Sequence, residues 1–347
     1  METRVIKINK DNIEDRLIQE AADIIKDGGL VAFPTETVYG LGANGLDEVA
    51  VSKIFKAKGR PQDNPLILHI HSMEGIKDLV TEIPDLSIRV MEEFWPGPLT
   101  ILFKRSSKVP DIITAGLDTV ALRMPKNDIA LGIIRASNCP IAAPSANTSG
   151  RPSPTSSDHV IQDLMGKADM IIDGGTTGIG LESTVLDLSG DIAMILRPGG
   201  VTLEDLRRVI PNVVEDSSII KSNMIPKSPG QKYRHYAPNA EMIVFSVSVE
   251  NMVANIIEKT GEYMDKGKTV GIMATDETKN LYKDGLIISL GSRDNKESIA
   301  HNLFKTIRLF DEANVDIILG EGVDLPDLGM AIMNRMMKAA SGKVIKV

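Results

Sequence analysis

The chain has 347 residues, of which 42% are hydrophobic and 25% charged, as expected for a globular protein of about two domains. No run of about 18 apolar residues occurs, so no transmembrane helix or other membrane role is predicted. The net charge of −8 argues against a protein that mainly coats nucleic acid, because such domains are basic. The single cysteine, Cys139, excludes an internal disulfide and a cysteine-built zinc site, and it indicates the reducing cytoplasm. The charged segment 1–16 contains no apolar core, so no secretory signal is expected.

The chain up to about residue 210 alternates helical patterns with short apolar runs. Residues 13–27 place apolar side chains on one helical face, with Asp11 or Asn12 as the expected N-cap and Gly28 beyond the end. Other expected helices and strands follow: helices at 86–94, 129–137 and 203–209, and strands at 30–33, 66–70, 99–103, 120–122, 141–143, 170–172, 185–188 and 194–196. This alternation predicts an α/β domain, although it does not give the order of the strands.

Residues 222–239, SNMIPKSPGQKYRHYAPN, are a linker by composition, since they contain three prolines and little apolar periodicity. After them, strands are expected at 242–245, 270–274, 287–290 and 317–319, with helices at 252–264, 299–313 and 330–340. This pattern is typical of a small Rossmann-like domain with a mostly parallel sheet, here without the GxGxxG turn of a dinucleotide site. The predicted bounds are therefore 1–221, 222–239 and 240–347.

Several polar segments adjoin the expected strands. The segment 34–42, PTETVYGLG, follows a strand, and Ser145 to Asn147 follow another with hydroxyl and amide groups suited to an anion. Lys58 and Arg60 are expected to project from a loop broken by glycine and proline, as a pair suited to polyphosphate. Each segment alone is also compatible with an ordinary turn, and a lone strand histidine such as His69 is more often a core residue.

Arg123 ends a strand rich in apolar residues, so its charge needs a carboxylate partner, either a protein acid or an amino-acid substrate. Ser183 precedes a strand and Arg197 follows one. Either can be structural, because an arginine before Pro-Gly-Gly can simply extend its charged end to solvent.

The motifs PTETVYGLG, Lys58-Gly-Arg60, PLILHI, FWPGPLT, RMP, APSANTSGRPSPT, ESTV and RPGG occur in this order. Together they resemble the YrdC-like family of threonylcarbamoyl-AMP synthases. The SPGQKYRHYAP segment before a small α/β domain is similar to the long, two-domain form of that family. The resemblance implies an α/β protein with an N-terminal YrdC-like twisted mixed-sheet domain and a small C-terminal Rossmann-like domain.

The resemblance also implies an activity. It implies a nucleotidyltransferase that converts L-threonine, bicarbonate and ATP, with Mg²⁺, into threonylcarbamoyl-AMP and pyrophosphate for tRNA threonylcarbamoyladenosine modification. It implies Lys58 and Arg60 as catalytic residues and no metal ligands from the protein. The implied ATP-binding residues are Arg60, Asn64, Thr119, Ser145, Asn147, Ser153, Arg197 and Tyr236. The implied threonine-binding residues are Thr37, His69, Arg123, Ala143 and Ser183. A downstream machinery that transfers the group to tRNA is expected as a partner.

Two other functions compete with this enzymatic one. The first is a double-stranded RNA-binding or ribosome-assembly protein, which would bind RNA phosphates through Lys53, Lys56, Lys58 and Arg60. Weak RNA binding is also compatible with the enzyme. The charge of −8 and the hydroxyl-rich anion site favour the enzyme. A hydrogenase-maturation relative would need acylphosphatase and zinc-finger parts, for which this chain with one cysteine has no sequence.

The linker carries one further expectation. Residues 228–238 are rich in proline, yet they include Tyr233, Arg234, His235 and Tyr236, which suit contacts to phosphates or stacking over a ligand. We expect this segment to close as a lid over the first domain's site. The alternative is a tether whose aromatic residues pack on the domain surfaces.

Overall fold

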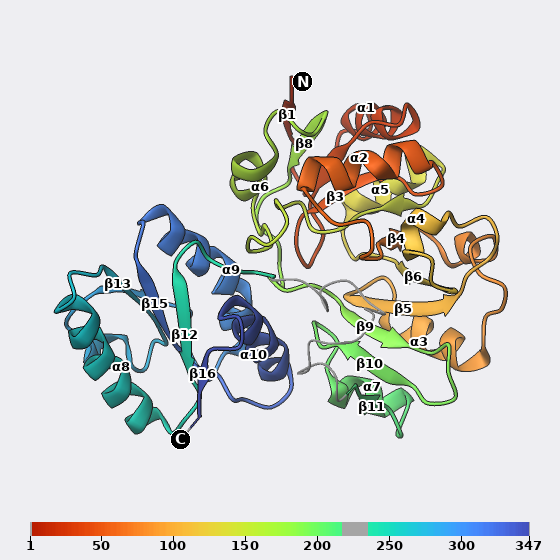
Figure 1. The fold of residues 1–347 in the computed structure, drawn as a ribbon. Coiled ribbons are helices and arrows are strands. Elements are labelled where there is room, and N and C mark those ends of the chain that lie inside the picture. The colour runs from red at the N-terminus through yellow and green to blue at the C-terminus, as the bar shows by residue number, and fades with distance from the viewer. Residues whose placement is uncertain (1, 217–234, 347) are drawn as a thin grey trace. The chain divides into compact units, whose positions relative to one another are not determined.

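The structure is a computed structural model that describes residues 2–216 and 235–346, and the chain divides into two compact units (Figure 1). The first unit contains the described residues up to 149, 153–178 and 182–216. The second contains residues 150–152, 179–181 and 235–346. Residues 217–234 lie outside the described residues, and they include 222–234 of the predicted linker 222–239. None of the helices in the described ranges is long and apolar enough to cross a membrane.

The first unit is built on a mixed sheet of eleven strands, ordered β1-β8-β2-β3-β7-β4-β6-β5-β9-β10-β11. The strands are β1 (Arg4–Lys7), β2 (Val31–Phe33), β3 (Gly40–Asn44), β4 (Ile67–His69), β5 (Leu99–Lys104), β6 (Thr119–Arg123), β7 (Ile141–Ala142), β8 (Met170–Asp173), β9 (Thr184–Asp187), β10 (Met194–Arg197) and β11 (Val214–Glu215). The helices are α1 (Asp15–Lys26), α2 (Glu48–Lys58), η1 (Met73–Ile76), α3 (Asp85–Phe94), α4 (Asp111–Thr114), α5 (Asp128–Ser137), α6 (Ser157–Leu164) and α7 (Leu203–Val209). The predicted α/β mixed-sheet class is confirmed.

The alternation of side chains along β2 explains why this sheet is covered on both faces. Val31 and Phe33 point into a core shared with α1 and α5, whereas Ala32 between them belongs to a second core shared with α2 and α3. Side chains alternate across a strand, so a short, wholly apolar strand such as β2 needs a helical layer on each side.

One predicted detail of α1 is wrong. The helix begins at Asp15 after Glu14, so neither Asp11 nor Asn12 caps it. Asn12 instead closes a turn, its backbone N–H donating to the carbonyl of Asn9 at 3.1 Å. The predicted end is correct, since the residue that follows the C-cap is Gly28 with a φ of +73°.

The second unit contains a five-stranded sheet in which every pairing is parallel, ordered β14-β13-β15-β12-β16. Its strands are β12 (Glu241–Phe245), β13 (Val270–Ala274), β14 (Leu286–Ser289), β15 (Ile317–Glu321) and β16 (Val344–Ile345). Its helices are α8 (Val249–Met264), η3 (Lys279–Leu281), α9 (Lys296–Glu312) and α10 (Leu328–Ala339). Helix α8 covers one face of the sheet, and α9 and α10 cover the other (Figure 1). The predicted small Rossmann-like domain is therefore confirmed as a parallel α/β unit.

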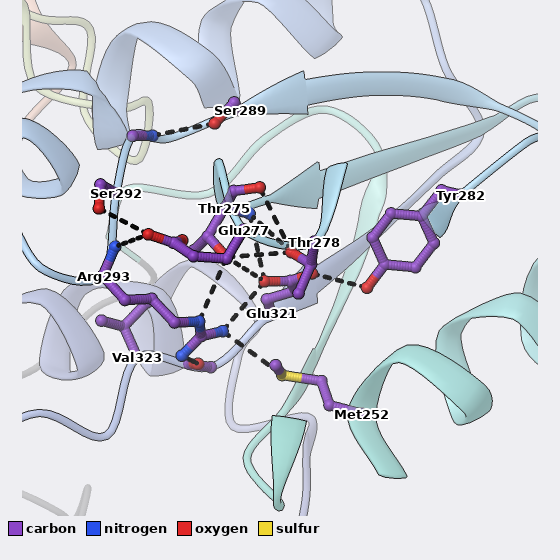
Figure 2. A network of polar contacts seen from close by, with 12 residues as sticks. Met252, Thr275, Glu277, Thr278, Tyr282, Ser289, Ser292, Arg293, Glu321 and Val323 are labelled. Atoms are coloured by element: carbon purple, nitrogen blue, oxygen red, sulfur yellow. Dashed lines mark hydrogen bonds and ion pairs between the residues drawn. The ribbon is translucent and has the colours of Figure 1, made fainter. Parts of the chain in front are cut away.

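A polar network joins the loops at the carboxyl ends of β13, β14 and β15 (Figure 2). At its centre, Glu321 is fully buried at the end of β15. Its Oε1 accepts a hydrogen bond from the Tyr282 hydroxyl at 2.6 Å, and its Oε2 accepts one from the Thr275 hydroxyl at 2.9 Å. Arg293 pairs with the same Oε2 at 3.0 Å. Because both carboxylate oxygens have partners, we interpret this network as a structural link between three loops.

Candidate functional site

Lys58 organises the first part of the site. It is the last residue of α2, and Gly59 ends the helix in a left-handed conformation with a φ of +62°. The side chain is only 2% exposed, and its ammonium group donates to the carbonyl oxygens of Ser145 and, at 2.5 Å, Asn147. Ser145 Oγ donates in turn to Asn147 Oδ1 at 2.6 Å. Three residues predicted for the phosphate site are thus in direct contact.

This arrangement corrects the expectation that Lys58 and Arg60 project from a surface loop. Lys58 is buried because its ammonium group replaces water with backbone carbonyls of the Ser145–Asn147 turn. Arg60 folds back, its Nη2 donating to the carbonyls of Pro65 at 3.1 Å and Asn64 at 3.3 Å. Buried Lys58 therefore does not belong to an exposed surface of the kind that duplex RNA contacts, and Lys53 donates to the Gly28 carbonyl at 2.6 Å. These contacts weaken the RNA-binding alternative.

A buried ion pair forms the second part. Arg123 at the end of β6 is 4% exposed, and its Nη2 lies 2.8 Å from Oε2 of Glu36. His69 ends the neighbouring strand β4 and is directly opposite Arg123 in the parallel register. Burial, assisted by the charge of Arg123, lowers the pKa of His69 to about 3, so its imidazole is neutral. In this structure, which contains no substrate, the partner of Arg123 is the protein acid Glu36.

The loop between β2 and β3 positions Glu36 and Thr37. Thr37 is fully buried, and its hydroxyl lies 2.8 Å from the hydroxyl of Thr35. Thr35 Oγ1 also donates to the Val38 carbonyl at 2.7 Å and accepts from the backbone N–H of Thr37 at 3.2 Å. A threonine that bonds to the backbone two and three residues on fixes such a turn.

Arg197 and Ser183 form the third part. Arg197 ends β10 and donates from Nε and Nη2 to the carbonyl of Ser183, at 3.1 Å and 2.9 Å. Ser183 Oγ lies 2.8 Å from the hydroxyl of Thr100. The FWPGPLT segment, residues 94–100, contacts both the second and the third part of the site. On the side of the Glu36–Arg123 pair, Arg123 Nε donates to the Gly97 carbonyl at 3.3 Å. On the side of Ser183, the backbone N–H of Thr184 donates to the Pro98 carbonyl at 2.9 Å.

The remaining predicted residues lie in several places. Asn64 is buried, and its Oδ1 has no hydrogen-bond partner among the described residues. Ser153 is fully buried and donates to Glu182 at 2.5 Å, whereas Thr119 is half-buried at the start of β6. Ala143 is buried directly after β7. Tyr236 belongs to the second unit, where its ring centroid lies 5.0 Å from that of Phe304.

Two acidic residues in the site had no role assigned from the sequence. Glu36 pairs with Arg123, and Glu182 accepts from Ser153. The signal for Glu36 is its place between two threonines directly after a buried strand, where α/β ligand sites usually form, but a tight structural turn explains the same residues. Its partner, Arg123, is distant in sequence, and strand order decides that they meet.

Two family models match nearly the whole chain. One, described as "Telomere recombination", matches residues 23–199, and the other, described as "Threonylcarbamoyl-AMP synthase, C-terminal domain", matches residues 201–341. The threonylcarbamoyl-AMP synthase of Pyrococcus abyssi is 50% identical over 339 residues, which cover 97% of this chain and 98% of that protein. The chain belongs to the two-domain, Sua5-type threonylcarbamoyl-AMP synthases. It is therefore a nucleotidyltransferase-type, ATP-using enzyme that serves the threonylcarbamoyladenosine modification of tRNA.

Other relatives agree with this assignment. The threonylcarbamoyl-AMP synthase of Bacillus subtilis is 46% identical over 333 residues, covering 96% of this chain and 95% of that protein. The crystal structure of P. abyssi Sua5 complexed with L-threonine has a TM-score of 0.94 at 48% identity and covers 100% of both chains. A histidine-and-tyrosine double-alanine variant of P. abyssi Sua5 has a TM-score of 0.95 at 48% identity, covering 99% of this chain and 98% of that one.

Proposed function

We propose that the first unit catalyses the reaction of L-threonine, bicarbonate and ATP to threonylcarbamoyl-AMP and pyrophosphate. The observation that carries this assignment of the site is buried Arg123 beside neutral His69. A desolvated guanidinium binds a carboxylate strongly and with fixed geometry, and an amino acid brings such a carboxylate. His69 is uncharged, so of these two residues only Arg123 offers a positive charge to the substrate carboxylate.

The same surroundings suit the threonine side chain. In our proposal Thr37, His69 and Ser183 surround the substrate hydroxyl, and Ala143 contacts the methyl group. Buried polar groups are left without partners when the substrate lacks its hydroxyl, so such analogues are rejected strongly. Serine keeps the hydroxyl, and its rejection rests on the missing methyl, which discriminates by only about 1–3 kcal/mol.

The chemistry needs no enzyme nucleophile. The threonine amine bonds to the carbon of bicarbonate, giving a carbamate and water. A carbamate oxygen then bonds to the α-phosphorus of ATP while the bond from that phosphorus to pyrophosphate breaks. Positioning and charge neutralisation supply the catalysis. We assign Lys58 and Arg60 to this task, and assign the nucleotide to Arg60, Asn64, Thr119, Ser145, Asn147, Ser153, Arg197 and Tyr236.

Mg²⁺ enters this proposal as part of the substrate, bound to ATP. Across residues 2–216 and 235–346, no three Asp, Glu, His or Cys side chains gather as metal ligands. Mg²⁺ in nucleotide sites is usually held by substrate phosphates, water and at most one or two carboxylates, so this residue set suits it. When bound, it neutralises charge on the phosphates.

We further propose a division of labour along the chain, with catalysis in residues 1–221, a lid in 222–239 and a small supporting domain in 240–347. The labile product passes to a machinery that transfers the threonylcarbamoyl group to tRNA. We expect the enzyme in the cytoplasm, with RNA binding that is weak at most.

The test of this function is the release of pyrophosphate from ATP by the full chain. We expect release to require L-threonine, bicarbonate and Mg²⁺ together, and a threonylcarbamoyl adenylate to accumulate in equal amount. The control reaction contains glycine in place of threonine. Equal release without threonine would contradict the proposal.

A further inference from the structure

The Glu36–Arg123 pair has too few hydrogen bonds for a buried pair of charges. The two side chains are 13% and 5% exposed, and their charged atoms lie 2.8 Å apart. That contact does not have hydrogen-bond geometry, and neither oxygen of Glu36 has a hydrogen-bond partner in the described part of the chain. Buried ionised groups normally gain several hydrogen bonds that offset the loss of water. Acceptor capacity is therefore left open on Glu36.

Adjacent groups share this property. Nη2 of Arg123 and Nδ1 of His69 are also buried without a hydrogen-bond partner among the described residues. The three side chains come from the β2–β3 loop, β4 and β6: Arg123 pairs with Glu36 and lies beside His69, at the proposed carboxylate subsite. One place in the protein thus combines an unsatisfied acid, a guanidinium and a neutral imidazole, which is a set of groups suited to a polar ligand.

The two charges of this pair match the two charges of an amino-acid head group. Resting on the proposed function, we infer that Glu36 binds the α-ammonium group of threonine and accepts its proton. The substrate inserts between the two side chains, with its carboxylate on Arg123 and its ammonium group on Glu36. Both buried charges then keep an opposite charge beside them, and the oxygens of Glu36 gain N–H donors.

The reaction requires such an acceptor. An ammonium group has no lone pair and cannot attack carbon, so the proton must leave before the carbamate forms. The proton moves from the α-ammonium group to a carboxylate oxygen of Glu36, which gives a neutral amine and a neutral acid. The nitrogen lone pair then bonds to the bicarbonate carbon, and one water leaves. A positioned acceptor of this kind typically contributes about 10²–10⁴-fold to a rate.

The competing explanation is that Glu36 serves only as the counter-ion of Arg123 and as support for its loop. The loop does not need it, because the hydroxyl of Thr35 already bonds to the backbone of Thr37 and Val38. A counter-ion alone would also affect every anionic ligand of Arg123 in the same way. A partner of the ammonium group would affect only ligands that carry one.

Binding measurements on the full chain without ATP separate these roles. The probes are L-threonine and 3-hydroxybutanoate, which keeps the carboxylate, hydroxyl and methyl of threonine but has hydrogen in place of the ammonium group. We expect the preference for threonine over 3-hydroxybutanoate to fall at least about tenfold in Glu36→Gln and to persist in Glu36→Asp, which keeps the charge. The control is Glu92→Gln on the exposed face of α3. An unchanged preference in a folded Glu36→Gln protein would overturn the inference.

The pH dependence of turnover gives the second measurement. With Glu36 in place, we expect kcat to vary little above neutral pH. In Glu36→Gln only solvent can take the proton, so kcat should be lower near neutrality and rise by about tenfold per pH unit toward the pKa of the amine. A parallel pH profile in the two proteins would overturn the proton-transfer role.

These outcomes are distinct from a failure of the proposed function, which would appear as threonine-independent pyrophosphate release in the unmodified enzyme. If Glu36→Gln does not fold, Glu36→Asp carries the test. Its shorter side chain should lower kcat and leave the KM for ATP and the preference for threonine in place. A weakened preference with unchanged kcat would contradict the inference.

Discussion

Lys58 combines a structural and a functional role in one side chain. Its ammonium group holds the carbonyls of Ser145 and Asn147, and the turn that it fixes carries the proposed phosphate ligands. Removing the amine leaves buried carbonyls without a donor. We expect Lys58→Ala to lower the free energy of unfolding by roughly 2–4 kcal/mol, measured by urea denaturation. Turnover should also fall by about a hundredfold or more, equivalent to about 3 kcal/mol of barrier.

The matched control is Lys56→Ala, two residues earlier on the same helix and exposed. It should change neither quantity, because surface substitutions usually stay within about 0.5 kcal/mol. A Lys58→Ala protein of normal stability and normal turnover would contradict both roles of Lys58.

Because His69 is buried in its neutral form, we expect the free energy of unfolding to depend on pH. The pKa of His69 is about 3 in the folded protein, lowered by burial and then by Arg123, and 6.5 when exposed. The unfolded chain therefore binds a proton that the folded protein does not, and stability is lost as pH falls from 6.5 toward 3. This one group contributes a slope of up to about 1.4 kcal/mol per pH unit in that window.

The measurement is urea denaturation at several pH values. His69→Asn should flatten the slope below pH 6.5 more than His71→Asn does, because burial and then Arg135 also lower the pKa of half-buried His71, but by less. Equal slopes in His69→Asn and the unmodified protein would rule out a buried neutral imidazole.

Lys58 and Glu36 show which features of the site can be predicted from the sequence and which cannot. The family resemblance implies one nucleotide site for Lys58, Ser145 and Asn147, and the structure brings these three residues into contact. Sequence does not predict that Lys58 is buried, since burial of a lysine depends on carbonyls about 90 residues away. The role of Glu36 is hidden for the same reason, because its partner Arg123 belongs to a strand brought near only by the tertiary fold.

At the scale of elements, apolar runs in the sequence locate most strands. Where a strand has no such run, its residue composition explains why. β3 is Gly40–Asn44, and its two glycines and small residues lack the β-branched and aromatic side chains typical of strands. It forms because the glycines allow close packing: a Cβ at Gly42 would lie 2.6 Å from the Phe33 ring. The order of the strands in the sheet cannot be predicted in this way. Hydrophobic periodicity indicates which face of a strand is buried, but not which strand pairs with it.

The network around Glu321 belongs to this scale, because it links three strand-ending loops (Figure 2). We expect Tyr282→Phe to lower the free energy of unfolding of the second unit by about 1–3 kcal/mol, since it leaves Oε1 of buried Glu321 without a donor. Hydrogen exchange of β13 and β15 in the full chain measures this. Tyr263→Phe, in the last turn of α8 and half-buried, is the matched control and should leave exchange unchanged. Unaltered protection in Tyr282→Phe would show that the network adds no stability.

At the scale of the whole molecule, our proposal gives both units a part in a reaction with labile intermediates. The carbamate and the adenylate both react with water, so a site that closes during turnover protects them. Residues 222–239 join the units in sequence and carry Tyr236, which packs on Phe304 of the second unit. That packing gives the second unit a role in our proposal, because it anchors one end of the lid segment.

The lid hypothesis predicts protection of the linker by ligands. Trypsin has potential cleavage sites in it at Lys227, Lys232 and Arg234. We expect threonine and ATP together to slow cleavage there at least about tenfold, with little effect from either alone, because a closed lid is stabilised by whatever binds only the closed state. Tyr236→Ala should abolish the protection and reduce synthesis of threonylcarbamoyl-AMP, while threonine binding persists. A passive tether would instead be cut at the same rate with and without both ligands, and Tyr236→Ala would then leave synthesis intact.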